Sequence, residues 1–172
     1  MKERFSTTEW SQVLRLPPLM FQFVALADGR MQPEEAAQFA QEVGDARSYN
    51  DPLLREVLTD LSTPAQFEAS YAESTRITSS GPDAIEREIM GIRTVLGEHL
   101  TADEYNRFFF SALGMAKLIA DAAGSEPKKK GVFGRAKAAE PEMSEIEAKA
   151  LFLLMTKFGA DLDAGRRALA NL

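Results

Sequence analysis

The sequence predicts an all-α fold, a single-domain helical bundle of eight to nine helices, and three observations support this. Apolar residues recur at helical spacing, as in the stripe formed by Ile85, Ile89, Ile92 and Leu96. Capping signals and first-turn prolines mark helix starts along the whole chain. No stretch alternates apolar and polar residues with a period of two, so we expect no sheet. The 172 residues fit one domain, 1–172.

Three capping boxes mark helix starts. Each pairs a hydroxyl residue with a glutamate three positions later, at Ser6-Thr-Thr-Glu9, Thr101-Ala-Asp-Glu104 and Ser144-Glu-Ile-Glu147. The hydroxyl accepts a free N–H of the first turn, and the glutamate reaches back to the N-cap. They predict helices that begin just after residues 6, 101 and 144.

Four prolines, Pro33, Pro52, Pro64 and Pro82, mark further starts, because a first-turn proline lacks only an N–H that has no helical partner there. Together the signals predict helices over about 7–15, 18–28, 33–43, 52–61, 64–79, 83–98, 102–123, 144–158 and 162–170.

Three segments are apolar on most sides and are therefore expected near the centre of the bundle: 19–27, 108–119 and 151–158. Most aromatic side chains are expected in the core, and these are Trp10, Phe21, Phe23, Phe108, Phe109, Phe110, Phe152 and Phe158.

An internal repeat is indicated by two alignments. A shift of 95 residues places Phe5-Ser-Thr-Thr-Glu-Trp10 on Leu100-Thr-Ala-Asp-Glu-Tyr105, and a shift of 112 places Met31-Gln-Pro-Glu-Glu-Ala36 on Met143-Ser-Glu-Ile-Glu-Ala148. The difference corresponds to residues 125–141, which contain two prolines, two glycines and a lysine run typical of a mobile basic loop. We therefore predict pseudo-two-fold halves of about 5–45 and 100–160, with 125–141 as an insertion in the second half.

A family resemblance follows from these residues. The stretch Val24-Ala-Leu-Ala-Asp-Gly-Arg-Met-Gln-Pro-Glu-Glu35 resembles the ADG-x-x-x-x-EE turn of the tellurite-resistance TerB-like family. The second half departs from the motif and reads Ala122-Ala-Gly124. The resemblance implies an all-helical, internally duplicated, non-enzymatic accessory protein of stress or defence, with a metal-binding role.

The acidic turns between helices are the candidate metal site. Carboxylates and free carbonyls at such corners suit a hard cation, Ca²⁺ or Mg²⁺, and the candidate ligands are Asp28, Glu34, Glu35, Asp121, Glu145 and Glu147. The alternative is structural, because a glutamate in the first turn of a helix is stabilised by the helix dipole. Asp28 can also accept N–H groups of the next helix.

Composition excludes several functional classes. The chain has no cysteine, which excludes disulfides and thiolate metal sites, and its single histidine, His99, excludes a histidine-rich zinc centre. We expect His99 to be a partly exposed residue at a helix end, where the dipole favours its protonated form. The net charge of −6 argues against nucleic acid as a partner.

The sequence therefore predicts a binding or adaptor module with a protein partner. The basic loop over 128–137 offers contact with an anionic membrane or an acidic partner. The longest apolar run, 150–155, is far short of the ~18–20 residues of a membrane helix, so we expect a cytoplasmic protein, free or peripheral at the inner membrane. Two alternatives remain open, a carboxylate-based metal-assisted enzyme and a structural subunit of a larger assembly.

Overall fold

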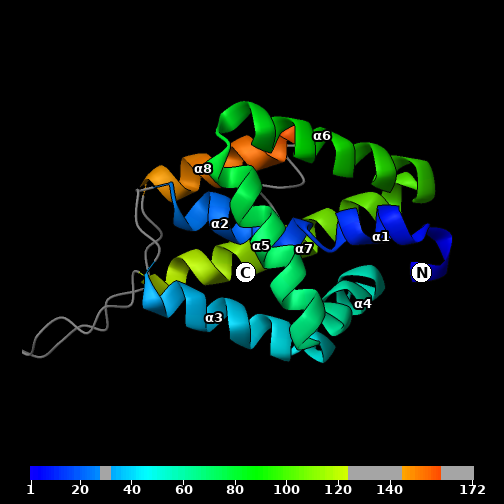
Figure 1. Cartoon of the computed structure of the whole chain (residues 1–172), viewed down its shortest axis with the longest axis horizontal. Helices are drawn as coiled ribbons and strands as arrows, with labels where there is room; N and C mark the ends of the chain where they lie inside the picture. Colours follow the sequence, from blue (N-terminus) through cyan, green and yellow to red (C-terminus); the bar gives the residue numbers. More distant parts are fainter. Residues whose placement is uncertain (28–31, 124–144, 160–172) are drawn as a thin grey trace, which may run out of the picture.

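The computed structural model is helical throughout the residues it describes, which are 1–27, 32–123 and 145–159 (Figure 1). This part of the chain contains no strand, so the predicted all-α class is confirmed. Its elements are η1 Lys2–Arg4, α1 Thr7–Val13, α2 Leu16–Ala25, α3 Pro33–Gly44, η2 Ala46–Ser48, α4 Pro52–Leu61, α5 Pro64–Ser79, α6 Pro82–His99, α7 Ala102–Ala123 and α8 Glu145–Lys157. The helix predicted at 162–170 and the basic insertion 125–141 lie outside the described residues.

Helix starts follow the local signals closely. Pro33, Pro52, Pro64 and Pro82 are each the first residue of a helix, as predicted. Gly81, the residue before α6, has φ of +94°, which only glycine adopts without strain.

Two of the predicted capping boxes are confirmed. The Glu9 carboxylate accepts the Ser6 N–H at 2.7 Å, and the Glu104 carboxylate accepts the Thr101 N–H at 2.9 Å. The third box begins at Ser144, outside the described residues.

The second helix differs slightly from its predicted range of 18–28. It begins at Leu16, with Pro17 and Pro18 both in the first turn, and it ends at Ala25. Two consecutive prolines fit there because the first N–H groups of a helix have no intrahelical partner.

The helices form a bundle around α2 and α7. These two pack against each other and run in the same direction, while α3 lies on α7 and α8 lies on α2, each antiparallel to its neighbour (Figure 1). α5 crosses α2, and α6 packs on α1 and α5. The N-terminal ends of α3 and α8 therefore lie at the same end of the bundle as the C-terminal ends of α2 and α7.

Apolar side chains fill the interior between these helices. Phe21 of α2 stacks on Phe39 of α3 with ring centroids 4.6 Å apart, and Phe109 of α7 stacks on Phe158 at 4.8 Å. Burial of each such side chain contributes about 1.5–3 kcal/mol to folding.

Most of the aromatic predictions hold, with one correction. Trp10, Phe21, Phe108, Phe109 and Phe158 are buried, and Phe23 and Phe110 are partly buried against the core. Phe152, however, is 49% exposed. Its apolar neighbours in sequence suggested a central helix that is apolar on most sides, whereas one side of α8 faces outward.

Two side-chain contacts link the segments that carry the two confirmed capping boxes. Arg4 forms an ion pair with Glu104 at 3.0 Å, and the His99 Nε2 atom lies 3.1 Å from the Glu9 carboxylate. Each basic residue thus contacts the capping glutamate of the other segment, and the two contacts hold the start of α1 against α6 and α7.

No described helix has the length and apolar content needed to cross a membrane.

Candidate functional site

The predicted acidic ligands that the structure describes lie at one end of the bundle, and they do not form a closed cluster of side chains. Asp28 lies outside the described residues, and Glu34 and Glu145 are exposed. Asp121 pairs with Lys117 one turn earlier on α7, at 2.7 Å. Among the described residues, no three of these acids bring ligand atoms within 4.8 Å of one another.

Glu35 and Glu147 differ from the other predicted ligands because they are buried, with 1% and 5% of their surface exposed. Each is the third residue of its helix, α3 or α8. The Glu35 carboxylate accepts the N–H of Gln32, the residue before α3, at 2.7 Å. Glu35 therefore has a capping role, which its position as the third helical residue could have indicated from sequence.

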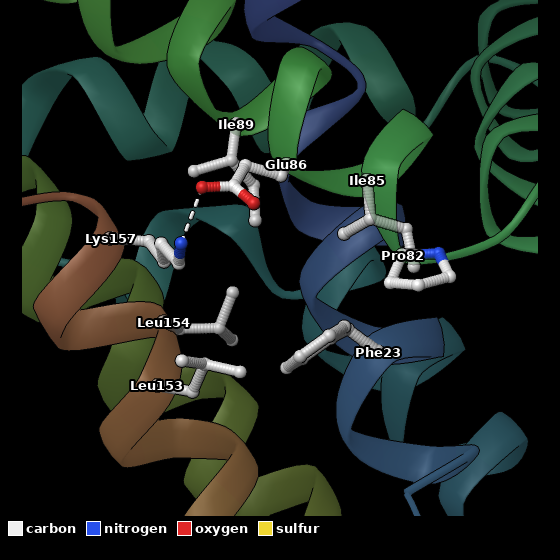
Figure 2. Close-up of a pocket in the computed structure, with 8 residues that line it drawn as sticks. All are labelled: Phe23, Pro82, Ile85, Glu86, Ile89, Leu153, Leu154 and Lys157. Carbon is white, nitrogen blue, oxygen red and sulfur yellow. Dashed lines mark hydrogen bonds and ion pairs between the residues drawn. The ribbon is translucent and has the colours of Figure 1, made fainter.

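An apolar pocket lies between α2, α6 and α8, and its volume is about 100 Å³. Figure 2 shows Phe23 of α2, Ile85 of α6 and Leu153 and Leu154 of α8 around one shared space. Pro82 and Ile89 of α6 complete its apolar lining.

The polar side chains of this pocket are Glu86 and Lys157, which form an ion pair with each other across its mouth (Figure 2). Because each charge is already compensated, the pocket offers a steric and apolar fit and little to orient a polar substrate.

The end of α8 beside the pocket is fixed by two side chains from other helices. The Arg93 guanidinium of α6 donates to the Lys157 carbonyl at 3.2 Å, and the Tyr105 hydroxyl of α7 donates to the Phe158 carbonyl at 2.6 Å. Burial raises the pKa of Tyr105 to about 12, so this hydroxyl stays a donor at neutral pH. These bonds satisfy carbonyls that the helix end leaves free and hold the wall of the pocket in place.

The outer side of α8 carries further apolar side chains. Ile146 is 50% exposed and Leu153 is 44% exposed, and they lie seven residues apart, on the same face. We call Ile146 and Leu153 the α8 apolar face, and Phe152 lies about 100° round the helix from Leu153. Isolated exposed apolar residues are ordinary on protein surfaces, but Leu153 of this face also lines the pocket, which makes the face a candidate interaction surface.

Sequence reasoning missed this site. The prediction treated 151–158 as apolar on most sides. In the structure the buried residues at the end of the described chain form a single stripe, which consists of 147, 150, 151, 154, 155 and 158. That stripe follows the helical period and leaves 146, 152 and 153 on the other side. The helical spacing of the buried residues could therefore have indicated an exposed side of α8.

Comparisons with protein-family models, with curated proteins and with solved structures find no match. The resemblance to the TerB-like family therefore stays a prediction that rests on the turn motif and the repeat. The predicted contact of residues 128–137 with an anionic membrane or an acidic partner also stays a prediction, because those residues lie outside the described part.

Proposed function

We propose that this protein is a non-enzymatic binding module of TerB-like type that receives one apolar side chain of a partner protein in the pocket between α2, α6 and α8. The observation that carries the proposal is the pocket itself, apolar, small and closed on one side by the Glu86–Lys157 pair.

The size of the pocket favours a side chain over a metabolite. Pockets for small molecules measure about 300–1,000 Å³, several times the 100 Å³ found here. A space of this size suits a single leucine, methionine or phenylalanine side chain. The adjoining α8 apolar face offers the continuing surface on which an amphipathic helix of the partner packs.

Two arrangements support the duplicated, TerB-like part of the proposal. The packing of α3 on α7 and of α8 on α2 is the reciprocal pattern that a pseudo-two-fold repeat produces. The paired residues also agree with the alignment shifts. Arg4 and His99, like Glu9 and Glu104, are separated by 95 positions, and the buried Glu35 and Glu147 are separated by 112. By this resemblance we place the protein among cytoplasmic accessory proteins of stress or defence.

Photo-crosslinking in the source cell tests the binding proposal. A benzophenone amino acid is placed at Leu153 and, as a matched control, at Leu118 of α7, a leucine that is 40% exposed and lies outside the pocket lining. We expect a discrete crosslinked partner from position 153 and none from position 118. Equal products from both positions, or none from 153, would refute a docking role for this pocket.

Direct binding then separates the remaining possibilities. The captured partner's helical segment should bind the wild type and Leu118→Asp equally, and Leu153→Asp at least about tenfold more weakly, because a charge enters an apolar contact. A crosslink between two copies of this chain would instead favour the alternative of a structural subunit.

A further inference from the structure

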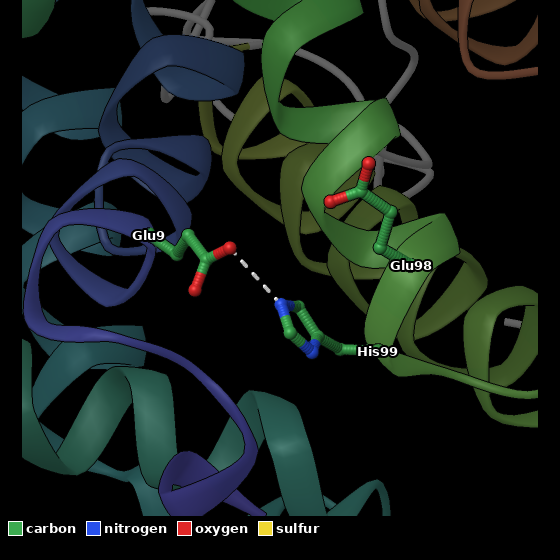
Figure 3. A group of neighbouring side chains, drawn as sticks. All are labelled: Glu9, Glu98 and His99. Atoms are coloured by element: carbon green, nitrogen blue, oxygen red, sulfur yellow. Dashed lines mark hydrogen bonds and ion pairs between the residues drawn. The ribbon is translucent and has the colours of Figure 1, made fainter.

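A second cluster of side chains lies where the start of α1 meets the end of α6. It contains Glu9, the third residue of α1, and Glu98 and His99, the last two residues of α6 (Figure 3). One ligand atom from each of the three lies within 4.8 Å of the other two. His99 is the only histidine of the chain.

Two of the three side chains are held in place by neighbours. One carboxylate oxygen of Glu9 accepts the Ser6 N–H at 2.7 Å, and this leaves the other oxygen facing the Nε2 atom of His99 at 3.1 Å. The hydrogen bonds from Ser6, and then the one from His99, lower the pKa of Glu9 to about 2, so its carboxylate is ionised at neutral pH. The His99 ring rests on Phe5, with centroids 4.9 Å apart.

Glu98 has no such structural role. It is exposed, and within the described part of the chain it makes no hydrogen bond or ion pair. The Arg4 guanidinium donates to the His99 carbonyl at 3.4 Å, and its charge is paired with Glu104. A metal ion binds imidazole in its neutral form, so with two carboxylates the ligand set carries a net charge of about −2, which one divalent cation compensates.

The donor atoms favour a particular class of cation. Zinc binds imidazole nitrogen and carboxylate oxygen at about 2.0–2.2 Å in a tetrahedral arrangement, which places two ligand atoms about 3.3 Å apart. The His99–Glu9 separation of 3.1 Å, which is also that of a hydrogen bond, is compatible with this value. Ca²⁺ and Mg²⁺ prefer a shell made only of oxygen atoms.

We propose that Glu9, Glu98 and His99 form a binding site for Zn²⁺ or a related transition-metal dication, with water as the fourth ligand, and that the bound metal ties the start of α1 to the end of α6. The site is independent of the apolar pocket. It also differs from the acidic inter-helix turns, which offer no imidazole.

The experiment uses the whole chain without an affinity tag, and Zn²⁺ alone is the probe. Competition with a chromophoric chelator measures the affinity of the wild type, Glu98→Gln and the matched control Glu68→Gln, an exposed glutamate of α5. We expect one Zn²⁺ per chain in the wild type and in the control. In Glu98→Gln we expect at least about tenfold weaker binding, since substitutions even in the outer shell of a metal site cost about 10–100-fold.

Two further measurements separate a metal site from a purely structural contact. In EDTA, Glu98→Gln should melt at the wild-type temperature, because the Glu9–His99 contact is intact. The ¹⁵N spectrum of the lone histidine should show the Nε2 resonance shift on addition of Zn²⁺, with a smaller shift in Glu98→Gln at the same concentration.

Three outcomes would overturn the proposal. They are the absence of stoichiometric Zn²⁺ in the wild type, equal affinity in Glu98→Gln, and Zn²⁺ binding that leaves the histidine resonances unchanged. Any of them would leave the contact between Glu9 and His99 as a purely structural link between helices. The spectroscopic readout needs no substitution of His99, so it does not depend on whether such a variant folds.

Discussion

The buried glutamate at the start of α3 allows a sharp test of capping against metal binding. Replacing Glu35 with alanine removes the acceptor of the Gln32 N–H, a bond of 2.7 Å, from a site that is 1% exposed. Loss of such a cap costs about 1 kcal/mol, and loss of one buried methylene adds about 0.8 kcal/mol. The expected destabilisation is about 2 kcal/mol, or a fall in Tm of about 4–8 °C for a chain of this size.

The neighbouring residue supplies the matched control. Glu34 is in the same helical turn but exposed, so Glu34→Ala should change the free energy of unfolding by no more than about 0.5 kcal/mol. Glu35→Gln keeps an oxygen that can accept the Gln32 N–H, so it should lose less stability than Glu35→Ala.

Thermal melts of the four proteins, each in EDTA and in millimolar Ca²⁺ or Mg²⁺, complete the test. If Glu35 acts only as a cap, the variants keep the same order in every buffer and no cation moves the wild type. If a cation binds at this end of the bundle, the wild type gains stability with it by mass action, and Glu35→Gln loses the gain. Unchanged Tm in Glu35→Ala would refute both roles.

Three further predictions concern single interactions. Tyr105→Phe removes the hydroxyl bond to the Phe158 carbonyl and should cost about 1 kcal/mol in chemical denaturation, with faster amide exchange at the end of α8. The hydrogen bond from the Thr101 backbone lowers the pKa of Glu104 from 4.5 to about 2. The ionised carboxylate therefore stabilises the fold fully above about pH 4.5, and this contribution is lost as the pH falls towards 2. In Glu104→Gln the free energy of unfolding should depend less on pH in that window. Gly81→Ala should destabilise the fold by about 1–3 kcal/mol, because Gly81 has a φ of +94°. Gly97→Ala should stabilise it by about 0.5–1 kcal/mol, because Gly97 lies inside α6 with open space at the Cβ position. Equal effects of the two substitutions on Tm would contradict this reasoning.

Helix starts could be predicted from the sequence because the interactions that fix them act within one turn. The prolines at 33, 52, 64 and 82 and the boxes at Ser6 and Thr101 needed no knowledge of neighbouring helices. The start of α2 was predicted at residue 18 and lies at Leu16, because two consecutive prolines fit more than one position in a first turn.

The candidate sites could not be predicted in the same way, because both depend on contacts between distant segments. The pocket needs Phe23, Ile85 and Leu153 side by side, and three helices contribute them. For Glu9 and His99, which are 90 residues apart, the sequence offered each a sufficient local explanation, a cap for one and a helix end for the other. Phe152 was placed in the core because its apolar neighbours concealed the outward face of α8.

One local device recurs at Glu9, Glu35 and Glu104, and its surroundings decide what each can do. In all three, a carboxylate accepts the N–H of the residue before the helix. At Glu104 the neighbouring basic residue is Arg4, which supplies a permanent charge and cannot ligate a metal. At Glu9 it is a histidine, whose neutral ring is a ligand.

The two metal tests should therefore give different answers at the two ends of the bundle. A Zn²⁺ response that Glu98→Gln weakens and Glu35→Gln leaves intact would assign transition-metal binding to the end where α1 meets α6, because only that end offers an imidazole. A Ca²⁺ or Mg²⁺ response with the opposite pattern would assign an oxygen-only site to the acidic turns. Each substitution serves as the control for the other, since both remove one negative charge from a helix end of the same chain.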